Sequence, residues 1–92
     1  MAPRYSFDPA KNASNLRKHG VSLADADGVL SDPLAITIED EAVEGEARWV
    51  TIGTNIFGTC LVVVWAPRGD AVRILSVRRP DPTERRAYEE GV

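Results

Sequence analysis

The stretch at 61–79 restricts the fold of this chain more than any other part of its sequence. Its first run, Leu61–Trp65, is apolar and mostly β-branched, a composition typical of a central strand covered on both faces. Residues 68–70 supply a turn in which Gly69 can adopt positive φ. Val72–Val77 has the composition of a second strand. Because the connection between the two runs is short, the sequence predicts an antiparallel hairpin.

Arginines gather at the edges of this hairpin. Arg68 lies at the turn, and Arg78 and Arg79 follow the second strand. Residues 68–86 hold six arginines against three acidic residues, whereas residues 25–46 hold eight acidic residues and no base. One interpretation is a mixed, solvated surface. The other is a basic cleft where the two basic ends of the chain meet, with the hairpin as a rigid floor for an anionic ligand.

The length of 92 residues predicts a single domain, residues 1–92. A hydrophobic content of 43% and a charged content of 27% argue against disorder of the whole chain. No apolar run approaches the ~20 residues of a membrane helix, and the N-terminus lacks a secretory pattern. We therefore expect a soluble cytoplasmic protein with no membrane partner. Cys60 is the lone cysteine, and Cys60 with His19 is too small a set for structural zinc, so neither a metal nor a cofactor is expected.

The first predicted helix spans Pro9–His19, with Asp8 as its N-cap and Gly20 as the residue that ends it. Its polar and mostly cationic positions recur at helical spacing and share one face; they are Lys11, Asn15, Lys18 and His19.

The remaining elements are expected in a simple order. A second helix at 23–30 precedes strands at 34–38, 48–53, 61–65 and 72–77, with an acidic loop at 39–46 and a last helix at 82–90. Residues 4–7 fit either a short edge strand or a clip onto the core. The prediction is an α+β fold of two N-terminal helices, a four-stranded antiparallel sheet and a short C-terminal helix.

The residue set suits phosphodiester cleavage without a metal. No dinucleotide fingerprint, P-loop or nucleophile elbow is present. Arg and Lys side chains can stabilise the charge of a pentavalent phosphate, and His19 can carry a proton near neutral pH. Each residue also has a plain alternative: His19 as a capping or packing residue, Lys11 as a solvated lysine, and Arg78 and Arg79 as a solubilising edge or ion-pair partners of the acidic loop.

Short motifs in a fixed order resemble the BrnT toxins of type II toxin–antitoxin modules. They are Phe7–Lys11, Asn15, Lys18–Ser22, Asp32–Pro33, Gly45–Arg48 with Gly53, Leu61–Val64, Arg73–Arg79 and Glu84–Tyr88. The resemblance covers nearly the whole chain. It implies a RelE-like fold and a ribonuclease activity.

The resemblance also implies site residues and partners. Its functional positions fall on Lys11, Arg68 and Arg78, and we add His19 as a candidate proton carrier. Arg68 and Arg78 are expected at the reacting phosphate and Lys11 at a neighbouring phosphate or the leaving group. Lys18, Arg48 and Arg79 are expected to position the RNA backbone. The expected partner is a BrnA-type antitoxin with a ribbon-helix-helix DNA-binding domain. The toxin would contact operator DNA only through this antitoxin. Toxin and antitoxin would together form a heterotetramer.

The sequence leaves two alternative classes of function. One is an interaction module that keeps antitoxin binding and has lost RNA cleavage; Pro67 before Arg68 and the net charge of −3 point to it. The other is a DNA-binding regulator, which is disfavoured because no recognition helix with a clear basic face is evident.

Overall fold

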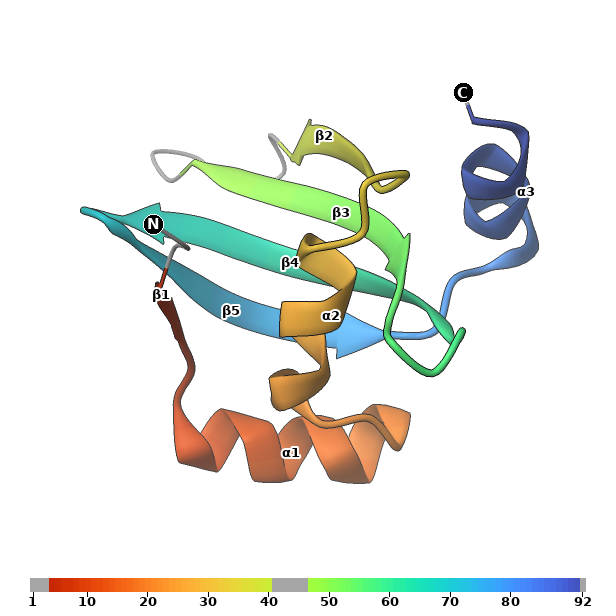
Figure 1. Ribbon diagram of the computed structural model, residues 1–92. Helices are drawn as coiled ribbons and strands as arrows, with labels where there is room; N and C mark the ends of the chain where they lie inside the picture. The colour runs from red at the N-terminus through yellow and green to blue at the C-terminus, as the bar shows by residue number, and fades with distance from the viewer. Residues whose placement is uncertain (1–3, 41–46, 92) are drawn as a thin grey trace.

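The computed structural model describes residues 4–40 and 47–91 (Figure 1). The elements follow in the order β1 (Arg4–Ser6), α1 (Pro9–His19), the 3-10 turn η1 (Leu23–Asp25), α2 (Ala26–Leu30), β2 (Ile36–Asp40), β3 (Arg48–Thr54), β4 (Cys60–Arg68), β5 (Ala71–Arg78) and α3 (Pro82–Glu90). The predicted α+β class is confirmed. The acidic loop expected at 39–46 falls mostly on residues 41–46, which lie outside the described residues, and its first two positions belong to β2.

The sheet has five strands rather than the four predicted, in the order β1-β5-β4-β3-β2. Strands β2 to β5 form the predicted antiparallel meander. The additional strand, β1, pairs in parallel with β5, so that Arg4 lies opposite Ala71 and Ser6 opposite Arg73. Parallel neighbours need a long connection, and here most of the chain separates the two strands. Local sequence patterns therefore left the pairing of residues 4–7 open.

Capping residues set the limits of α1 and α3 where the sequence predicts them. Asp8 caps the first turn of α1, and Gly20 ends the helix with a φ of 70°. Asp81 and Glu84 form a capping box at the start of α3. The single helix expected at 23–30 was wrong in detail, because this stretch begins as the 3-10 turn η1 and continues as the short α2. None of the described helices is long and apolar enough to cross a membrane.

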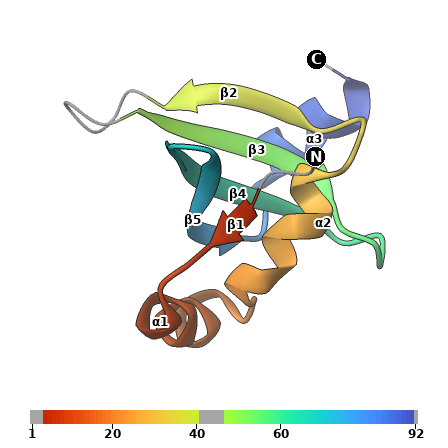
Figure 2. The ribbon, with the colours of Figure 1, turned by 60° about the vertical axis from the view of Figure 1, so that its left-hand side comes forward.

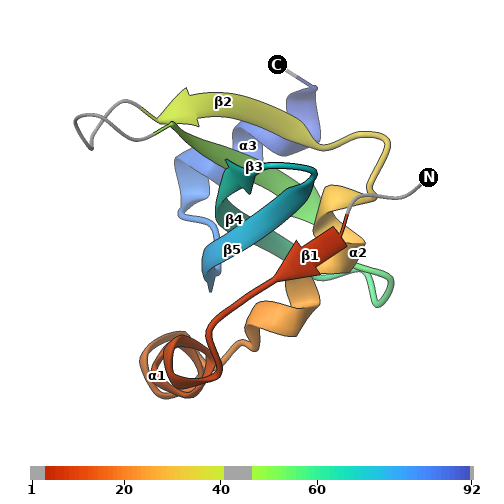
Figure 3. The same ribbon diagram turned by 90° about the vertical axis from the view of Figure 1, so that its left-hand side faces the viewer.

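The helices take three different positions around the sheet. The views in Figures 2 and 3 show α2 on one side of the sheet, α3 on the other, and α1 along the outer edge of β5. The hydrophobic core lies between α2 and the sheet; its buried members are Val21, Leu23, Ala26, Val29, Leu61, Val63, Ile74 and Val77. The opposite face of β3, β4 and β5 is therefore available for other side chains.

Helix α1 is held by amides rather than by apolar packing. Asn15 is buried, and its Nδ2 donates to the carbonyls of Val21 at 2.8 Å and Val77 at 2.7 Å. Its Oδ1 accepts the N–H of Val77 at 3.3 Å. The Oδ1 of Asn12 accepts the N–H of Leu23 at 2.8 Å. Asn15 is therefore buried, although the sequence places it on the polar and mostly cationic face of this helix.

The Val77 contacts explain why an amide is needed. β1 pairs with β5 only at residues 71–73, so β5 continues beyond the end of its outer neighbour. Both the N–H and the C=O of Val77 are turned to this outer side, where the Asn15 amide supplies an acceptor and a donor. A buried backbone group without a partner is costly. Asn15 thus replaces a missing strand partner and fixes α1 to the sheet at the same point.

The connection between α2 and β2 is organised by Asp32. Its Oδ2 accepts the N–H of Thr54 at 2.8 Å and the hydroxyl of Tyr88 at 2.6 Å. Its Oδ1 accepts the N–H of Leu34 at 2.9 Å. The Tyr88 bond is the main cause that lowers the pKa of Asp32, and the same bond raises the pKa of Tyr88. Gly53 permits the approach, because a Cβ there would lie 3.2 Å from Asp32 Oδ2.

Asn15→Leu is expected to lower the free energy of unfolding by about 2–4 kcal/mol, because the backbone groups that it satisfies lose their partners at about 1–3 kcal/mol each. Urea denaturation measures the change. Ser14→Leu, at an exposed position of the same helix, is the control and is expected to stay within about 0.5 kcal/mol of the parent. Equal losses in both variants would contradict the role given to the amide.

The Asp32–Tyr88 bond predicts how stability varies with pH. The lowered pKa of Asp32 gives stability that is present above the usual carboxyl range of about 4 and is lost as pH falls through the lowered value. The raised pKa of Tyr88 gives stability that is present below about 10 and is lost as pH rises through the raised value. Tyr88→Phe is expected to destabilise the protein near neutral pH and to flatten the alkaline flank.

Urea unfolding at a series of pH values tests this expectation, with Tyr5→Phe as the matched control that keeps the alkaline flank. The alkaline flank of the stability curve tests the Asp32–Tyr88 bond most directly. The acid flank is less specific, because the lowered pKa of Glu84 also contributes to the loss of stability at low pH. An unchanged alkaline flank in Tyr88→Phe would show that the bond does not stabilise the fold.

Candidate functional site

Four arginines point to the same side of the sheet: Arg48 from β3, Arg68 from β4, and Arg73 and Arg78 from β5. The strand register shows this, because opposing residues of an antiparallel pair lie on one face. Val62 lies opposite Arg78, Ala66 opposite Arg73, and Val50 opposite Val64. We call this set the arginine face. It lies on the side of the sheet that carries α3 and opposite the core.

A β-bulge places two arginines of β5, Arg73 and Arg78, on the same face of the sheet. Ile74 lies opposite Trp65 and Ser76 opposite Val64, so β5 holds one more residue than β4 at this point. In a regular strand Arg73 and Arg78, an odd number of positions apart, would point to opposite faces. The extra residue reverses the alternation and places both on the arginine face. Strand periodicity alone misses Arg73 for this reason.

The floor under the arginine face is apolar and closed to water. Val62 and Ala66 are fully buried, and Ile52 is 5% exposed. A low-dielectric floor strengthens the attraction between a guanidinium and an anion placed above it. The arrangement can hold an anionic ligand, as the sequence predicts for the hairpin.

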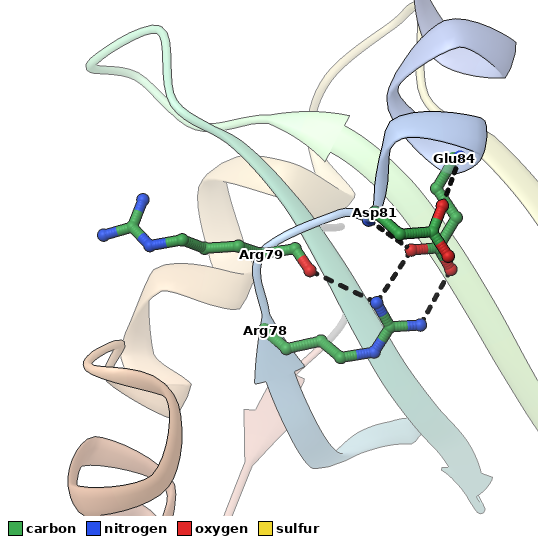
Figure 4. Close-up of polar contacts among 4 residues, drawn as sticks. All are labelled: Arg78, Arg79, Asp81 and Glu84. Carbon is green, nitrogen blue, oxygen red and sulfur yellow. Dashed lines mark hydrogen bonds and ion pairs between the residues drawn. The ribbon is translucent and has the colours of Figure 1, made fainter.

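Arg78 is already engaged by a carboxylate of α3. Its Nη1 and Nη2 donate to Oε1 and Oε2 of Glu84, each at 2.7 Å (Figure 4). The side chains are 36% and 21% exposed. The pair raises the pKa of Arg78 and lowers that of Glu84, chiefly through these hydrogen bonds. Arg78 is thus an ion-pair partner of the C-terminal helix. An incoming anion has to compete with Glu84.

Arg79 differs from its neighbour. Figure 4 shows its side chain extending away from α3, whereas that of Arg78 points toward Glu84. Arg79 is exposed, and its carbonyl accepts a hydrogen bond from Arg78 Nη1 at 3.2 Å. The side chains of these two consecutive arginines therefore lie in different places at the end of β5.

The predicted residues of α1 come from a different region. Lys11 and Lys18 are exposed, and His19 is half-buried in the last turn of the helix. Because α1 runs along the outer edge of β5 (Figure 3), these side chains border the sheet rather than stand on the arginine face. The structure brings Arg48, Arg68 and Arg78 to one face. The other predicted residues lie elsewhere: Lys11, Lys18 and His19 on α1, and Arg79 just beyond the end of β5.

Sequence reasoning passed over several residues of this region. The sequence could not show the face on which Arg73 lies, because that depends on the bulge. It could not show the pairing of Glu84 with Arg78, because that depends on the position of α3 over the sheet. Both belong to motifs that the sequence shows, but neither motif indicates the face on which a side chain lies. Among residues 4–40 and 47–91, no group of three or more His, Cys, Asp and Glu side chains is placed to hold a metal ion.

Comparison with known proteins gives matches of two kinds. The family described as "Ribonuclease toxin, BrnT, of type II toxin-antitoxin system" matches residues 7–84. The crystal structure of the Brucella abortus ribonuclease toxin BrnT is similar with a TM-score of 0.67 and 24% sequence identity, over 87% of this chain and 99% of that chain. At this identity the structural likeness supports the fold. No match was found among curated proteins.

The family match covers most of the chain, including α1, the hairpin and the start of α3. The fold agrees with that of a solved BrnT toxin. This protein belongs to the BrnT family of ribonuclease toxins of type II toxin–antitoxin systems.

Proposed function

We propose that this protein is a metal-independent endoribonuclease that cleaves RNA bound on the arginine face and thereby inhibits translation and growth in the cytoplasm. The observation that carries the proposal is the gathering of Arg48, Arg68, Arg73 and Arg78 on one side of the sheet over an apolar floor. Arginines bind phosphate oxygens in bidentate fashion. An arginine beside a phosphodiester stabilises the charge of its transition state.

Each residue has a role in this proposal. Arg68 and Arg78 stabilise negative charge at the reacting phosphate and at a second phosphate of the same strand, because the register places them six residues apart along β4, roughly 20 Å. Arg48 and Arg73 position the backbone between these two phosphates. A strand that leaves the arginine face across the outer edge of β5 reaches α1, where Lys11 and Lys18 bind further phosphates. His19, in the last turn of α1, carries the proton, a task that suits an imidazole near neutral pH.

The family belongs to type II toxin–antitoxin systems, so the protein has an antitoxin partner. We propose that this partner is of the BrnA type, with a ribbon-helix-helix domain that binds operator DNA, and that the two form a heterotetramer. The fold kinship that we propose is with RelE-like toxins, in which helices pack on a small sheet.

A second candidate is an interaction module that binds the antitoxin without cleaving RNA. The Arg78–Glu84 ion pair favours it, because the two terminal nitrogens of Arg78 are taken in the free protein. Pro67, which precedes Arg68 in β4, also restricts how that arginine is presented. RNA cleavage by the purified protein separates the two candidates.

Arg68→Ala and Arg78→Ala are each expected to lower RNA cleavage about a hundredfold, because each removes a charge that stabilises the transition state. Cleavage of a labelled RNA and growth after induction measure the loss. Arg86→Ala, exposed on α3, is the matched control, and addition of EDTA is expected to change nothing.

Arg68 lies at the hairpin turn and leaves the contact between Arg78 and α3 intact, so its variant separates lost chemistry from lost folding. Full activity in a folded Arg68→Ala and in Arg78→Ala would overturn the proposed site. Absence of cleavage by the folded parent would favour the interaction module.

Glu84→Gln is expected to tighten RNA binding about three- to tenfold, because it frees the guanidinium of Arg78 for a phosphate. Glutamine can still accept from the backbone in the capping box, so α3 keeps its start. The steepness of the salt dependence should also rise, since one more cation meets a phosphate. Fluorescence anisotropy with a 2′-O-methyl oligonucleotide, which cannot be cleaved, measures both.

Glu90→Gln removes the same charge at an exposed position of the same helix and is expected to change the affinity little. If both variants bind RNA with the affinity of the parent, Glu84 does not compete with RNA for Arg78.

A further inference from the structure

We propose that a hollow at the end of β5, separate from the arginine face, binds a phosphate group of the RNA strand. It has a volume of about 340 Å³ and lies between the β3–β4 turn and the start of α3. Its lining residues are Gly58, Thr59, Cys60, Arg79, Pro80 and Arg85. The inference deepens the proposed function, since it adds a binding site for the substrate class named there.

The charge of the lining selects an anion. Arg79 and Arg85 line the hollow, and among residues 4–40 and 47–91 no carboxylate is part of the lining. The ion pair of Arg85 with Glu89 is long, at 3.8 Å, and both side chains are 62% exposed. Exposed pairs of this kind contribute little, so Arg85 can turn to a phosphate at small cost. Two arginines that line one space can supply several N–H donors for the acceptor oxygens of a phosphate.

Of the three carboxylates whose charges act on Cys60, Glu89 pairs loosely with Arg85 and the other two are engaged away from the hollow. Glu84 accepts both of its hydrogen bonds from Arg78, and Asp32 accepts from Tyr88 and from a backbone N–H. Cys60 is half-buried beside them, and burial raises the pKa of its thiol. The thiol is therefore neutral near pH 7 and does not repel an anion.

The wall formed by the β3–β4 turn is ordered before any ligand arrives. Asn55 Oδ1 accepts the N–H groups of Phe57 at 2.9 Å and Thr59 at 3.0 Å. The N–H of Gly58 donates to the carbonyl of Asn55 at 3.0 Å. An ordered wall reduces the entropy lost on binding.

The position of the hollow relates it to the arginine face. Arg78 stands on that face, and the next residue, Arg79, lines the hollow. The two side chains point in different directions (Figure 4). A single strand of RNA that crosses the arginine face toward the end of β5 therefore meets a second phosphate site one residue further along the chain.

The lone cysteine provides a direct test. Cys60 is the only cysteine of the sequence and lines the hollow, so the rate of its alkylation by iodoacetamide in the folded protein reports on occupancy. We expect inorganic pyrophosphate to slow alkylation relative to potassium chloride of equal ionic strength. Arg79→Ala and Arg85→Ala are each expected to need about tenfold more pyrophosphate for half-protection. Arg86→Ala, next to Arg85 but outside the lining, is expected to match the parent.

Each variant is compared with and without ligand, because Arg85 itself lowers the pKa of Cys60 and its loss changes the unprotected rate. No protection of the parent, or equal protection of the Arg79 and Arg85 variants, would overturn the site.

A second arm distinguishes RNA from free phosphate as the source of the group. A 2′-O-methyl oligonucleotide is expected to protect Cys60 in the parent and in Arg86→Ala, and less in Arg79→Ala and Arg85→Ala. Protection by pyrophosphate alone would overturn the assignment to RNA. Since this oligonucleotide cannot be cleaved, an inactive protein that still shows protection would contradict the proposed ribonuclease activity and leave the phosphate site standing.

Discussion

The amide of Asn15 at the outer edge of β5 is the interaction on which the rest of the structure depends. It satisfies the backbone of Val77 where β1 has ended, and it attaches α1 to the sheet by the same bonds. β5 links several parts of the fold, because it pairs with β1 and β4 and leads into α3. It also carries Arg73 and Arg78. An edge left unpaired at this point would loosen the strand that presents both arginines.

Polar contacts also hold α3, and one of them belongs to the candidate site. Tyr88 binds Asp32, and Glu84 binds Arg78 through two short hydrogen bonds. In a chain of this size the hydrophobic core is modest. It holds α2, and specific hydrogen bonds help to place α1 and α3. The consequence is a link between folding and the proposed function: Arg78, which we propose binds a phosphate, also holds the C-terminal helix.

Local arrangement of charge matters more here than the net charge. The protein carries −3 overall, yet one side of its sheet gathers four arginines over an apolar floor. Two features of the backbone produce this. The strand alternation separates arginines from the core, and the bulge near Trp65 brings Arg73 to the side of Arg78. Membership of the BrnT family gives this face its proposed chemistry.

The sequence by itself determined what depends on neighbouring residues. Asp8 and Gly20 set the ends of α1, because caps act within one helical turn, and the hairpin followed from its turn and its β-branched strands. The family was recognisable from the order of short motifs. Tertiary structure alone decided the parallel pairing of β1, the bulge that turns Arg73, the burial of Asn15 and the capture of Arg78 by α3. Each of these joins segments distant in sequence, and a local pattern carries no information about which distant group will be the partner.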